Sequence, residues 1–327
     1  HDSLVGMEKI LGNLRRAKPI ASAFLAPILE SKIGGPIQRF RMSGEAGRES
    51  IRLGEAANQT GFPVLTRENS SIVSRIGRQK KVFILGSGAS SLELGPTHFL
   101  EIAKTPSIGF GAWPLHSFVP DMLAFGPTRG LQDYRKVFTE VMGRIDIVDA
   151  MPEVLLLRSS LPEDLSMYAS LPRPHRPKAR IYGRVSALSR TTRGLDAELQ
   201  YFFNAEYEGE FAITFDSGAT LLRMISLAIK SGATEVVLVG VDLNTPDYFW
   251  ERDPSFLHAN GFDSFETGQR RGSHSTMQDE RRPLPIDLVI AEVGRMFRTV
   301  SCGILSVVSE TSALSQFLPL YEWESKA

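Results

Sequence analysis

One stretch in the first third of the chain combines residue types that bind anions. Residues 82–85 form an apolar run typical of a strand buried on both faces, and Gly86, Ser87 and Gly88 follow it directly. Glycines at such a turn let backbone N–H groups approach a ligand, and a nearby helix start favours a phosphate or another anion. A dinucleotide fingerprint needs a third glycine at position 91, which is Ser91. The stretch predicts either an anion site or a plain strand-to-helix turn.

A second candidate anion site is a helix start in the second half of the chain. Ser217 and Gly218 precede an amphipathic helix over residues 220–231. The free N–H groups and the positive end of the dipole at a helix start favour an anion. Serine is also a common N-cap, so Ser217 alone has a simpler structural explanation.

A histidine in an irregular stretch is the candidate general base. His274 lies in Arg-Arg-Gly-Ser-His-Ser-Thr, and its type of side chain titrates near neutral pH. An exposed loop histidine is the alternative. Nearby arginines could bind phosphate or carboxylate, or they could simply be solvated at the surface: Arg270, Arg271, Arg281 and Arg282. Three aromatic residues of the same stretch could cover a ligand or could pack the loop: Tyr248, Phe249 and Trp250.

Several classes of site are excluded by what the sequence lacks. It has no Asp-x-Asp pair, no Gly-x-Ser-x-Gly elbow, no Walker A loop and no His-Glu-x-x-His motif, which favours chemistry without a metal. Cys302 is the only cysteine, so neither an intrachain disulfide nor a cysteine zinc cluster is expected, and a reducing compartment fits. Lys plus Arg and Asp plus Glu both number 37, so overall charge gives no reason to expect nucleic acid.

These residues must be positioned by strands and helices of an α/β domain. Apolar runs predict strands over residues 82–85, 107–112, 119–125, 153–158, 235–242 and 303–308, and periodicity predicts helices over residues 132–142, 220–231 and 286–297. Residues 159–180 are expected to be loop, with His175 exposed to solvent and no regular structure over residues 172–177. Ligands of open α/β sheets bind beyond the carboxyl ends of the strands, where the candidate glycines lie.

The chain is predicted to have two parts. Residues 1–80 form a basic helical extension with 13 Lys and Arg against 7 Asp and Glu, an excess of about +6. Residues 81–327 form the nucleotide-binding domain, with a lid at about 244–283, because a forty-residue irregular stretch in a compact domain is usually functional or disordered. Residues 1–6 precede Met7 and are expected to be a remnant of the expression vector. The extension either packs on the domain or on a sister subunit, or it contacts a membrane surface through residues 7–80.

Five short motifs follow one another along the chain. They are the glycine turn (Gly86, Ser87, Gly88, Ala89, Ser90), Ser217-Gly218 before a helix, the strand ending Gly240-Val241-Asp242, Ser273-His274-Ser275 before the last long helix, and the closing strand with Ser312-Ala313-Leu314. In this order they resemble the bacterial sialyltransferases of glycosyltransferase family 42 and related flagellin-modifying transferases. The resemblance covers roughly residues 81–319.

The resemblance implies a single Rossmann-like, GT-A-like domain with a mostly parallel sheet, helices on both faces and a lid. It implies an inverting transferase that uses a CMP-activated acidic sugar and needs neither a metal nor another cofactor. His274 would then deprotonate the acceptor hydroxyl, and Ser217 and Gly218 would face the donor carboxylate. The other expected donor and nucleotide contacts are Gly86, Ser87, Gly88, Ala89, Ser90, Gly126, Asp242, Asn244, Tyr248, Trp250 and Ser275.

The sequence departs from the family pattern at several of these positions. Ser87 replaces the asparagine of the glycine loop, a second asparagine is absent near Ala112, and Gly126 replaces the asparagine before a proline. The first lid tyrosine falls at Asn244, and the second falls near Trp250, with Tyr248 close by. The donor identity therefore stays open among sialic acid, other nonulosonic acids and Kdo.

Two other function classes remain in view. A Rossmann oxidoreductase is the first, although Ser91 stands where its third glycine is required. A catalytically inactive CMP-sugar-binding homologue is the second, because of the missing asparagines. We expect a homo-oligomer in the bacterial cytoplasm, with contact to the inner face of the membrane as one interpretation of the extension. The acceptor is expected to be a surface glycan, a lipopolysaccharide-type glycolipid or a protein.

Overall fold

The sheet contains eight strands that all run parallel. The computed structural model describes residues 41–126, 132–158, 162–187, 189–203, 211–245, 247–265 and 284–324. Most of the strands contain a short apolar run, as expected for strands covered on both faces. The predicted α/β, Rossmann-like parallel sheet with helices on both faces is therefore confirmed. The strands are β1 (Lys81–Leu85), β2 (Ser107–Phe110), β3 (Met122–Phe125), β4 (Glu153–Leu157), β5 (Ala179–Ser186), β6 (Ile213–Asp216), β7 (Glu235–Val239) and β8 (Ile304–Val307).

The order of the strands places one reversal at the centre of the sheet. The order is β6-β5-β4-β3-β2-β1-β7-β8, so successive strands run outward from β1 on one side, and the chain then returns to place β7 on the other side. Phe83 of β1 is in register with Ser107 of β2 and with Val237 of β7. Ligands of open α/β sheets bind at such a reversal, beyond the carboxyl ends of the strands.

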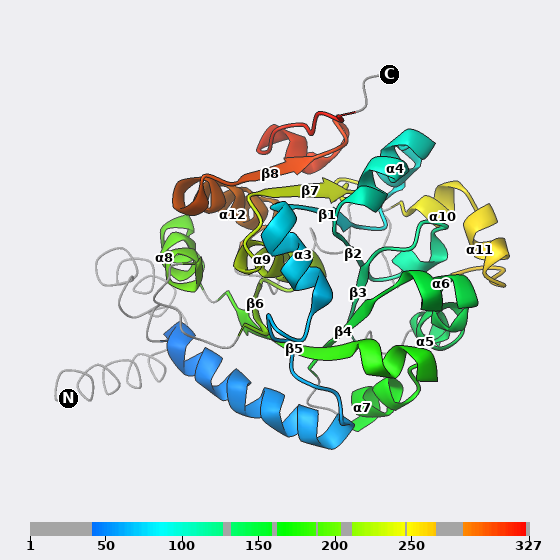
Figure 1. The fold of residues 1–327 in the computed structure, drawn as a ribbon. Helices are drawn as coiled ribbons and strands as arrows, with labels where there is room; N and C mark the ends of the chain where they lie inside the picture. Colours follow the sequence, from blue (N-terminus) through cyan, green and yellow to red (C-terminus); the bar gives the residue numbers. More distant parts are fainter. Residues whose placement is uncertain are drawn as a thin grey trace, which may run out of the picture.

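Helices cover both sides of the curled sheet. Figure 1 shows the sheet curved into a half-barrel, with α9 inside the curve, where it contacts β6, β1, β2 and β7. Its apolar residues Leu222, Met224 and Ile225 are at most 1% exposed, so α9 forms the centre of the core. The helices described after the first strand are α4 (Pro96–Lys104), α5 (Gln132–Thr139), α6 (Ile145–Ala150), α7 (Pro162–Ala169), α8 (Thr192–Phe203), α9 (Thr220–Lys230), α10 (Phe249–Arg252), α11 (Ser255–Ala259) and α12 (Ile286–Ser301), with the 3-10 turns η1 (Ala89–Glu93), η2 (Trp113–Leu115), η3 (Val141–Gly143), η4 (Arg173–Lys178) and η5 (Ala313–Gln316).

Helix α3 (Ser71–Gln79) lies across the amino ends of the strands. Its N-cap Ser70 donates a hydrogen bond to the buried Glu153 at the start of β4, at 2.6 Å. Arg75 pairs with Asp121 just before β3, also at 2.6 Å. Burial raises the pKa of Glu153 to about 7, because the surrounding protein disfavours its charged form. Since α3 covers this edge, the opposite, carboxyl edge is the one available to a ligand.

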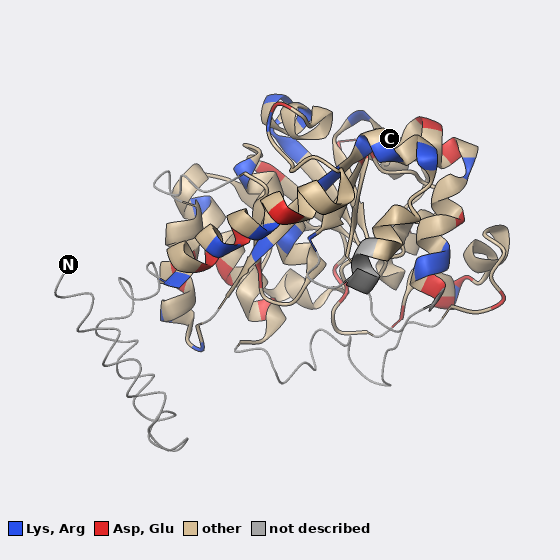
Figure 2. Ribbon diagram, turned by 90° about the horizontal axis from the view of Figure 1, so that it is seen from below, with Lys and Arg blue, Asp and Glu red and all other residues tan. Residues whose placement is uncertain are grey.

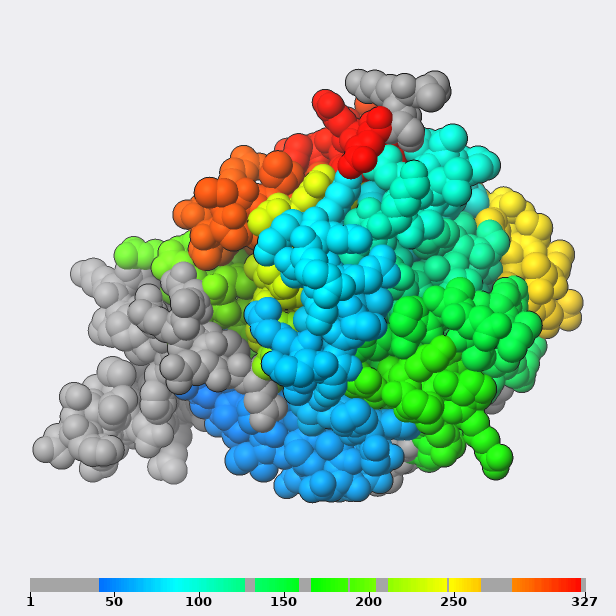
Figure 3. All heavy atoms as spheres, in the orientation of Figure 1, coloured from blue at the N-terminus to red at the C-terminus, as the bar shows by residue number. Residues whose placement is uncertain are grey.

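The described part of the basic extension packs on the domain. Residues 41–60 are helical, with Met42 and Leu53 at most 1% exposed. Glu49 of this helix pairs with Arg158 at 2.6 Å and accepts a hydrogen bond from the backbone N–H of Arg184 at 3.2 Å. Figure 3 shows this helix and α3 lying against the rest of the chain. Residues 1–40 lie outside the described residues, so the expected boundary at residue 80 and the membrane interpretation stay predictions.

The expectation of a loop over residues 159–180 was wrong. The segment contains α7, the 3-10 turn η4 and the start of β5. The prolines fit η4 because a 3-10 turn this short needs few backbone N–H donors. His175 was expected in solvent, yet it is fully buried and its Nε2 lies 2.6 Å from the carbonyl oxygen of Met142. Burial lowers the pKa of His175, so this histidine serves as a packed core residue.

The surface carries both signs of charge. Figure 2 shows basic and acidic residues next to one another on the helices of the face seen from below, in agreement with the equal totals of 37 in the sequence. Within the described ranges, no helix combines the length and the apolar character needed to cross a lipid bilayer.

Candidate functional site

Two glycine-containing loops touch at the reversal between β1 and β7. The N–H of Gly88, after β1, donates to the carbonyl oxygen of Gly240, after β7, at 2.8 Å. Gly240 has a φ of +61°, and a Cβ on it would lie 2.1 Å from the carbonyl oxygen of Gly86. A Cβ on Gly88 would lie 2.5 Å from a carboxylate oxygen of Asp242. Any other residue at these positions would separate the loops, so the glycines are needed for this contact.

Asp242 connects the two loops through its side chain. Its Oδ2 accepts a hydrogen bond from the N–H of Ser90 at 3.0 Å, and its Oδ1 accepts from the hydroxyl of Ser90. Asp242 is 7% exposed, and its backbone carbonyl accepts from the N–H groups of Asn244 and Ala313. Ser90 was predicted to contact the nucleotide; in the structure it donates to Asp242.

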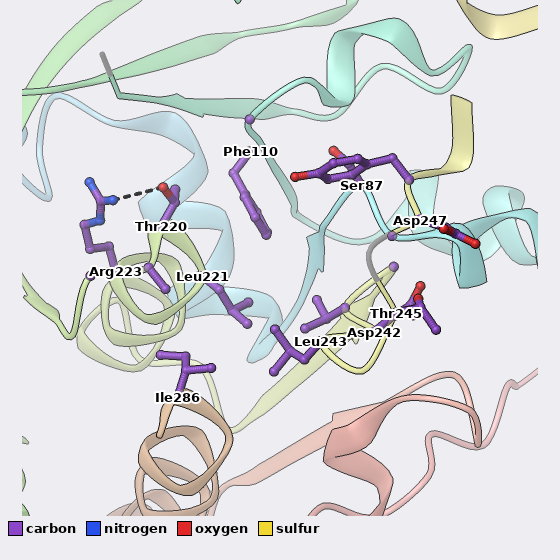
Figure 4. A pocket seen from close by; sticks show the side chains of 17 residues that line it. Ser87, Phe110, Thr220, Leu221, Arg223, Asp242, Leu243, Thr245, Asp247 and Ile286 are labelled. Atoms are coloured by element: carbon purple, nitrogen blue, oxygen red, sulfur yellow. Dashed lines mark hydrogen bonds between the residues drawn. The ribbon is translucent and has the colours of Figure 1, made fainter. Parts of the chain in front are cut away.

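A cavity of about 360 Å³ opens beside these loops. This volume lies in the range of about 300–1,000 Å³ that is usual for small-molecule sites. Figure 4 shows apolar side chains between the pair Arg223 and Thr220 on one side and polar residues of the β7 loop on the other. The lining residues are Ser87, Gly88, Phe110, Gly111, Gly218, Ala219, Thr220, Leu221, Arg223, Gly240, Val241, Asp242, Leu243, Thr245, Asp247, Tyr248 and Ile286.

Most backbone N–H groups of the glycine turn are already hydrogen-bonded within the protein. The N–H groups of Gly86 and Gly88 donate to Val239 and Gly240, and that of Ala89 donates to Asp247. The N–H of Ser90 donates to Asp242. The helix that follows, η1, is only a five-residue 3-10 turn. These N–H groups are therefore not available to a phosphate, and Ser87 and Gly88 contribute to the site as part of the cavity wall.

The start of α9 forms the opposite wall and has no capping side chain. Its N-cap is Ala219, not Ser217. Ser217 is 5% exposed and its hydroxyl has no hydrogen-bond partner. The carboxylate of Asp216, at the end of β6, accepts from the N–H groups of Gly218 at 2.9 Å and Ala219 at 3.0 Å. The first-turn N–H groups that follow point toward the cavity end of the helix, where an anion is favourable.

The predicted lid residues occupy different places. Residues 247–249 pair antiparallel with the glycine turn through a bridge between Gly88 and Tyr248. Tyr248 lines the cavity and stacks on the buried ring of Trp250, with centroids 4.5 Å apart. Trp250 therefore supports Tyr248 from behind. Asn244 is exposed and donates to the carbonyl oxygen of Thr311 at 2.7 Å, outside the cavity lining.

The remaining predicted contacts are outside the cavity wall or outside the described residues. Gly126 ends β3, and a Cβ there would lie 3.8 Å from Nη1 of Arg223. His274 and Ser275 fall in residues 266–283, which the structure does not describe, so their roles stay predictions.

The cavity wall, where described, contains no histidine. His116 is buried among aromatic rings, including Trp113 at 4.6 Å between centroids. This burial lowers the pKa of His116 to about 4, so its imidazole is neutral at physiological pH. His98 accepts a hydrogen bond from the N–H of Gly95, and His258 is exposed on α11. None of these three is placed to deprotonate a ligand in the cavity.

Several lining residues were not recognised from the sequence. Phe110 ends β2 and Ile286 begins α12, and both enter the cavity only because the sheet curls around α9. Arg223 could have been noticed, because it is a charged residue among the apolar positions of the predicted helix 220–231. In the described part of the chain, no group of three or more His, Cys, Asp or Glu residues is arranged to hold a metal ion.

Comparisons with known proteins find similarity to solved structures. No protein-family model and no curated protein sequence matches the chain. The monofunctional alpha-2,3-sialyltransferase Cst-I from Campylobacter jejuni is 14% identical, with a TM-score of 0.39, and the match covers 74% of this chain and 80% of that one. An alpha-2,3-sialyltransferase from Campylobacter jejuni in apo form is 12% identical, with a TM-score of 0.36 and the same coverage. Identities and TM-scores this low establish neither family nor substrate.

Proposed function

We propose that the protein is a glycosyltransferase that transfers an acidic sugar from a CMP-sugar to a glycan, glycolipid or protein acceptor. One observation carries the proposal. Three of the motifs that resemble the sialyltransferases, represented by Gly88, Gly218 and Asp242, are far apart in the sequence and line a single cavity. The cavity lies at the reversal in strand order, where α/β folds bind nucleotides.

The same geometry disfavours a dinucleotide. In that mode the pyrophosphate lies on the free N–H groups of a glycine turn and on the helix that follows it. Here the turn is followed by the short 3-10 helix η1, and the carboxylate of Asp242 accepts the hydrogen bond from the N–H of Ser90. A pyrophosphate at this turn would meet a negative charge. The α9 start, where Arg184 and Arg223 offset the charge of Asp216, is the better place for an anionic ligand.

The proposed chemistry needs a base and a place for the leaving group. His274, carried over from the resemblance, deprotonates the acceptor hydroxyl, which is a weak nucleophile at neutral pH. Inversion at the anomeric carbon follows from a single displacement by that hydroxyl. Metal independence is part of the proposal: positively charged and N–H groups of the chain stabilise the departing phosphate. Residues 7–80 are proposed to support assembly or membrane contact.

Calorimetric titration of the full chain tests the binding part of this proposal. We expect saturable binding of CMP at one site and no binding of NAD under the same conditions. Cytidine should bind more weakly than CMP, because it lacks the phosphate. Binding of NAD without binding of CMP would overturn the proposal in favour of an oxidoreductase. Absence of binding for both nucleotides would also contradict it.

A further inference from the structure

Arg223 is the only positively charged residue among the described residues that line the cavity. It belongs to the first turn of α9, and its side chain is 9% exposed. Its Nη2 donates to the hydroxyl of Thr220 at 3.0 Å (Figure 4). Its Nε and Nη1 are buried and have no hydrogen-bond partner. A guanidinium can donate five hydrogen bonds, so much of the donor capacity of Arg223 is unused.

The nearest carboxylate does not use this capacity. Asp216 forms an ion pair with Arg184 through Oδ2, and its Oδ1 accepts from the N–H groups of Gly218 and Ala219. Nε of Arg223 lies 3.6 Å from Oδ1, too far for a hydrogen bond. Among the described residues no other carboxylate forms an ion pair with Arg223. Two arginines therefore share one carboxylate, and one positive charge is left without a counter-charge.

Burial of such a charge is unfavourable unless a ligand compensates it. A buried charge without a partner destabilises a fold, and replacement by an apolar residue of similar size is often neutral or stabilising. The α9 start beside Arg223 lacks a capping side chain, and the buried hydroxyl of Ser217 is also without a partner. The guanidinium of Arg223 and the N–H groups of the first turn of α9 thus lie at one end of the cavity, and both suit an oxyanion.

We propose that Arg223 and the first turn of α9 form the anion-binding subsite of the cavity. The ligand group is a carboxylate or phosphate oxygen, bound by the guanidinium of Arg223 together with the N–H groups of the first turn of α9. The source of this group rests on the proposed function, which offers two: the carboxylate of the acidic sugar and the phosphate of CMP. The glycine turn is less suited to this role, because the N–H groups of Gly86, Gly88, Ala89 and Ser90 are hydrogen-bonded within the protein.

The test measures binding and thermal stability of Arg223→Met and Arg223→Lys in the full chain. The probes are CMP, cytidine, N-acetylneuraminate and inorganic phosphate. Arg223→Met should weaken binding of the anionic probe by about tenfold or more, as expected for loss of a charge-assisted hydrogen bond. Its affinity for cytidine should equal that of the wild type. Arg223→Lys keeps the charge but lacks the planar fork, so its loss should be smaller.

A matched control separates the subsite from a general effect of charge. Arg75→Met removes one positive charge and an ion pair with Asp121 at the opposite edge of the sheet, and it should leave binding of every probe unchanged. Without ligand, the Tm of Arg223→Met should stay within a few degrees of the wild type, because Asp216 keeps Arg184 as its partner. If Arg223 had only a structural role, Arg223→Met would instead lower the Tm and leave the affinity for the anionic probes unchanged.

The outcomes distinguish this proposal from the proposed function. Loss of affinity for CMP alone identifies the phosphate as the ligand group, and loss for N-acetylneuraminate alone identifies the carboxylate. If the wild type binds phosphate or N-acetylneuraminate but not CMP, and Arg223→Met does not bind them, the subsite stands while the proposed function fails. Unchanged anion binding by Arg223→Met overturns the subsite, and so does a wild type that binds none of the anionic probes.

Discussion

Replacement of His274 by alanine is expected to lower the rate of sugar transfer by about 10²–10⁴, the usual loss when a general base is removed. The acceptor hydroxyl cannot lose its proton readily at neutral pH without a base. Among the described residues of the cavity wall, no other histidine is present to act as the base in place of His274. Binding of CMP and the Tm should both be retained, because the proposed role is chemical. Steady-state release of CMP, together with titration and thermal melting, measures all three quantities.

The pH dependence provides a second readout for the same residue. A base must be neutral to accept a proton, so the wild-type rate should fall as the pH drops below about 6.5, the ordinary pKa of histidine. His258→Ala is the matched control, because His258 is exposed on α11 and outside the cavity wall. Near-normal turnover by His274→Ala would remove His274 from the mechanism. A large loss of Tm would assign it a structural role.

Gly88→Val is expected to weaken binding of CMP on the order of 100-fold, as for a disruption that costs about 3 kcal/mol. The new Cβ would lie 2.5 Å from Oδ2 of Asp242 and 2.8 Å from the carbonyl oxygen of Gly240. The carboxylate cannot move away without losing its bonds to Ser90. The two loops must therefore separate, and the cavity wall changes shape. Titration with CMP measures the loss, and a lower Tm should accompany it.

Gly95→Val is the control for this substitution. Gly95 lies seven residues later, and a Cβ there would have no heavy atom within 4 Å. Its φ of −88° is accessible to other residues, so CMP affinity should stay within a factor of about two of the wild-type value. Equal affinity of Gly88→Val and Gly95→Val for CMP would contradict a nucleotide site at the contact between the loops.

The sequence predicted the parts of the fold whose signal is local. β1, β7 and α9 contain uninterrupted apolar runs or a clear helical period, and they form the centre of the structure. β5 was missed because it contains Arg180 and Arg184, which are unusual in a buried strand. Arg180 donates to the carbonyl oxygen of Asn69 at 2.9 Å, and Arg184 pairs with Asp216. These partners lie in distant segments, so a local pattern could not identify the strand.

The site could be predicted only in outline. The glycine turn and the start of α9 were recognised as segments, and the structure brings both to one cavity. The roles within them differ from the expectation: Asp216 rather than Ser217 accepts from the N–H groups before α9, and Ser90 binds Asp242. Hydrogen bonds between loops decide these roles, and residue types alone do not reveal them.

Release of CMP from CMP-sugars is the measurement that tests the central claim most directly. The full chain is assayed with CMP-sialic acid, other CMP-nonulosonic acids and CMP-Kdo, with surface-glycan acceptors and with EDTA present. We predict acceptor-dependent release of CMP from at least one donor, unaffected by EDTA and lost in His274→Ala. Binding of CMP without turnover of any donor would indicate the inactive homologue. Turnover only with Mg²⁺ or Mn²⁺ would contradict metal independence, and neither binding nor release would contradict the account as a whole.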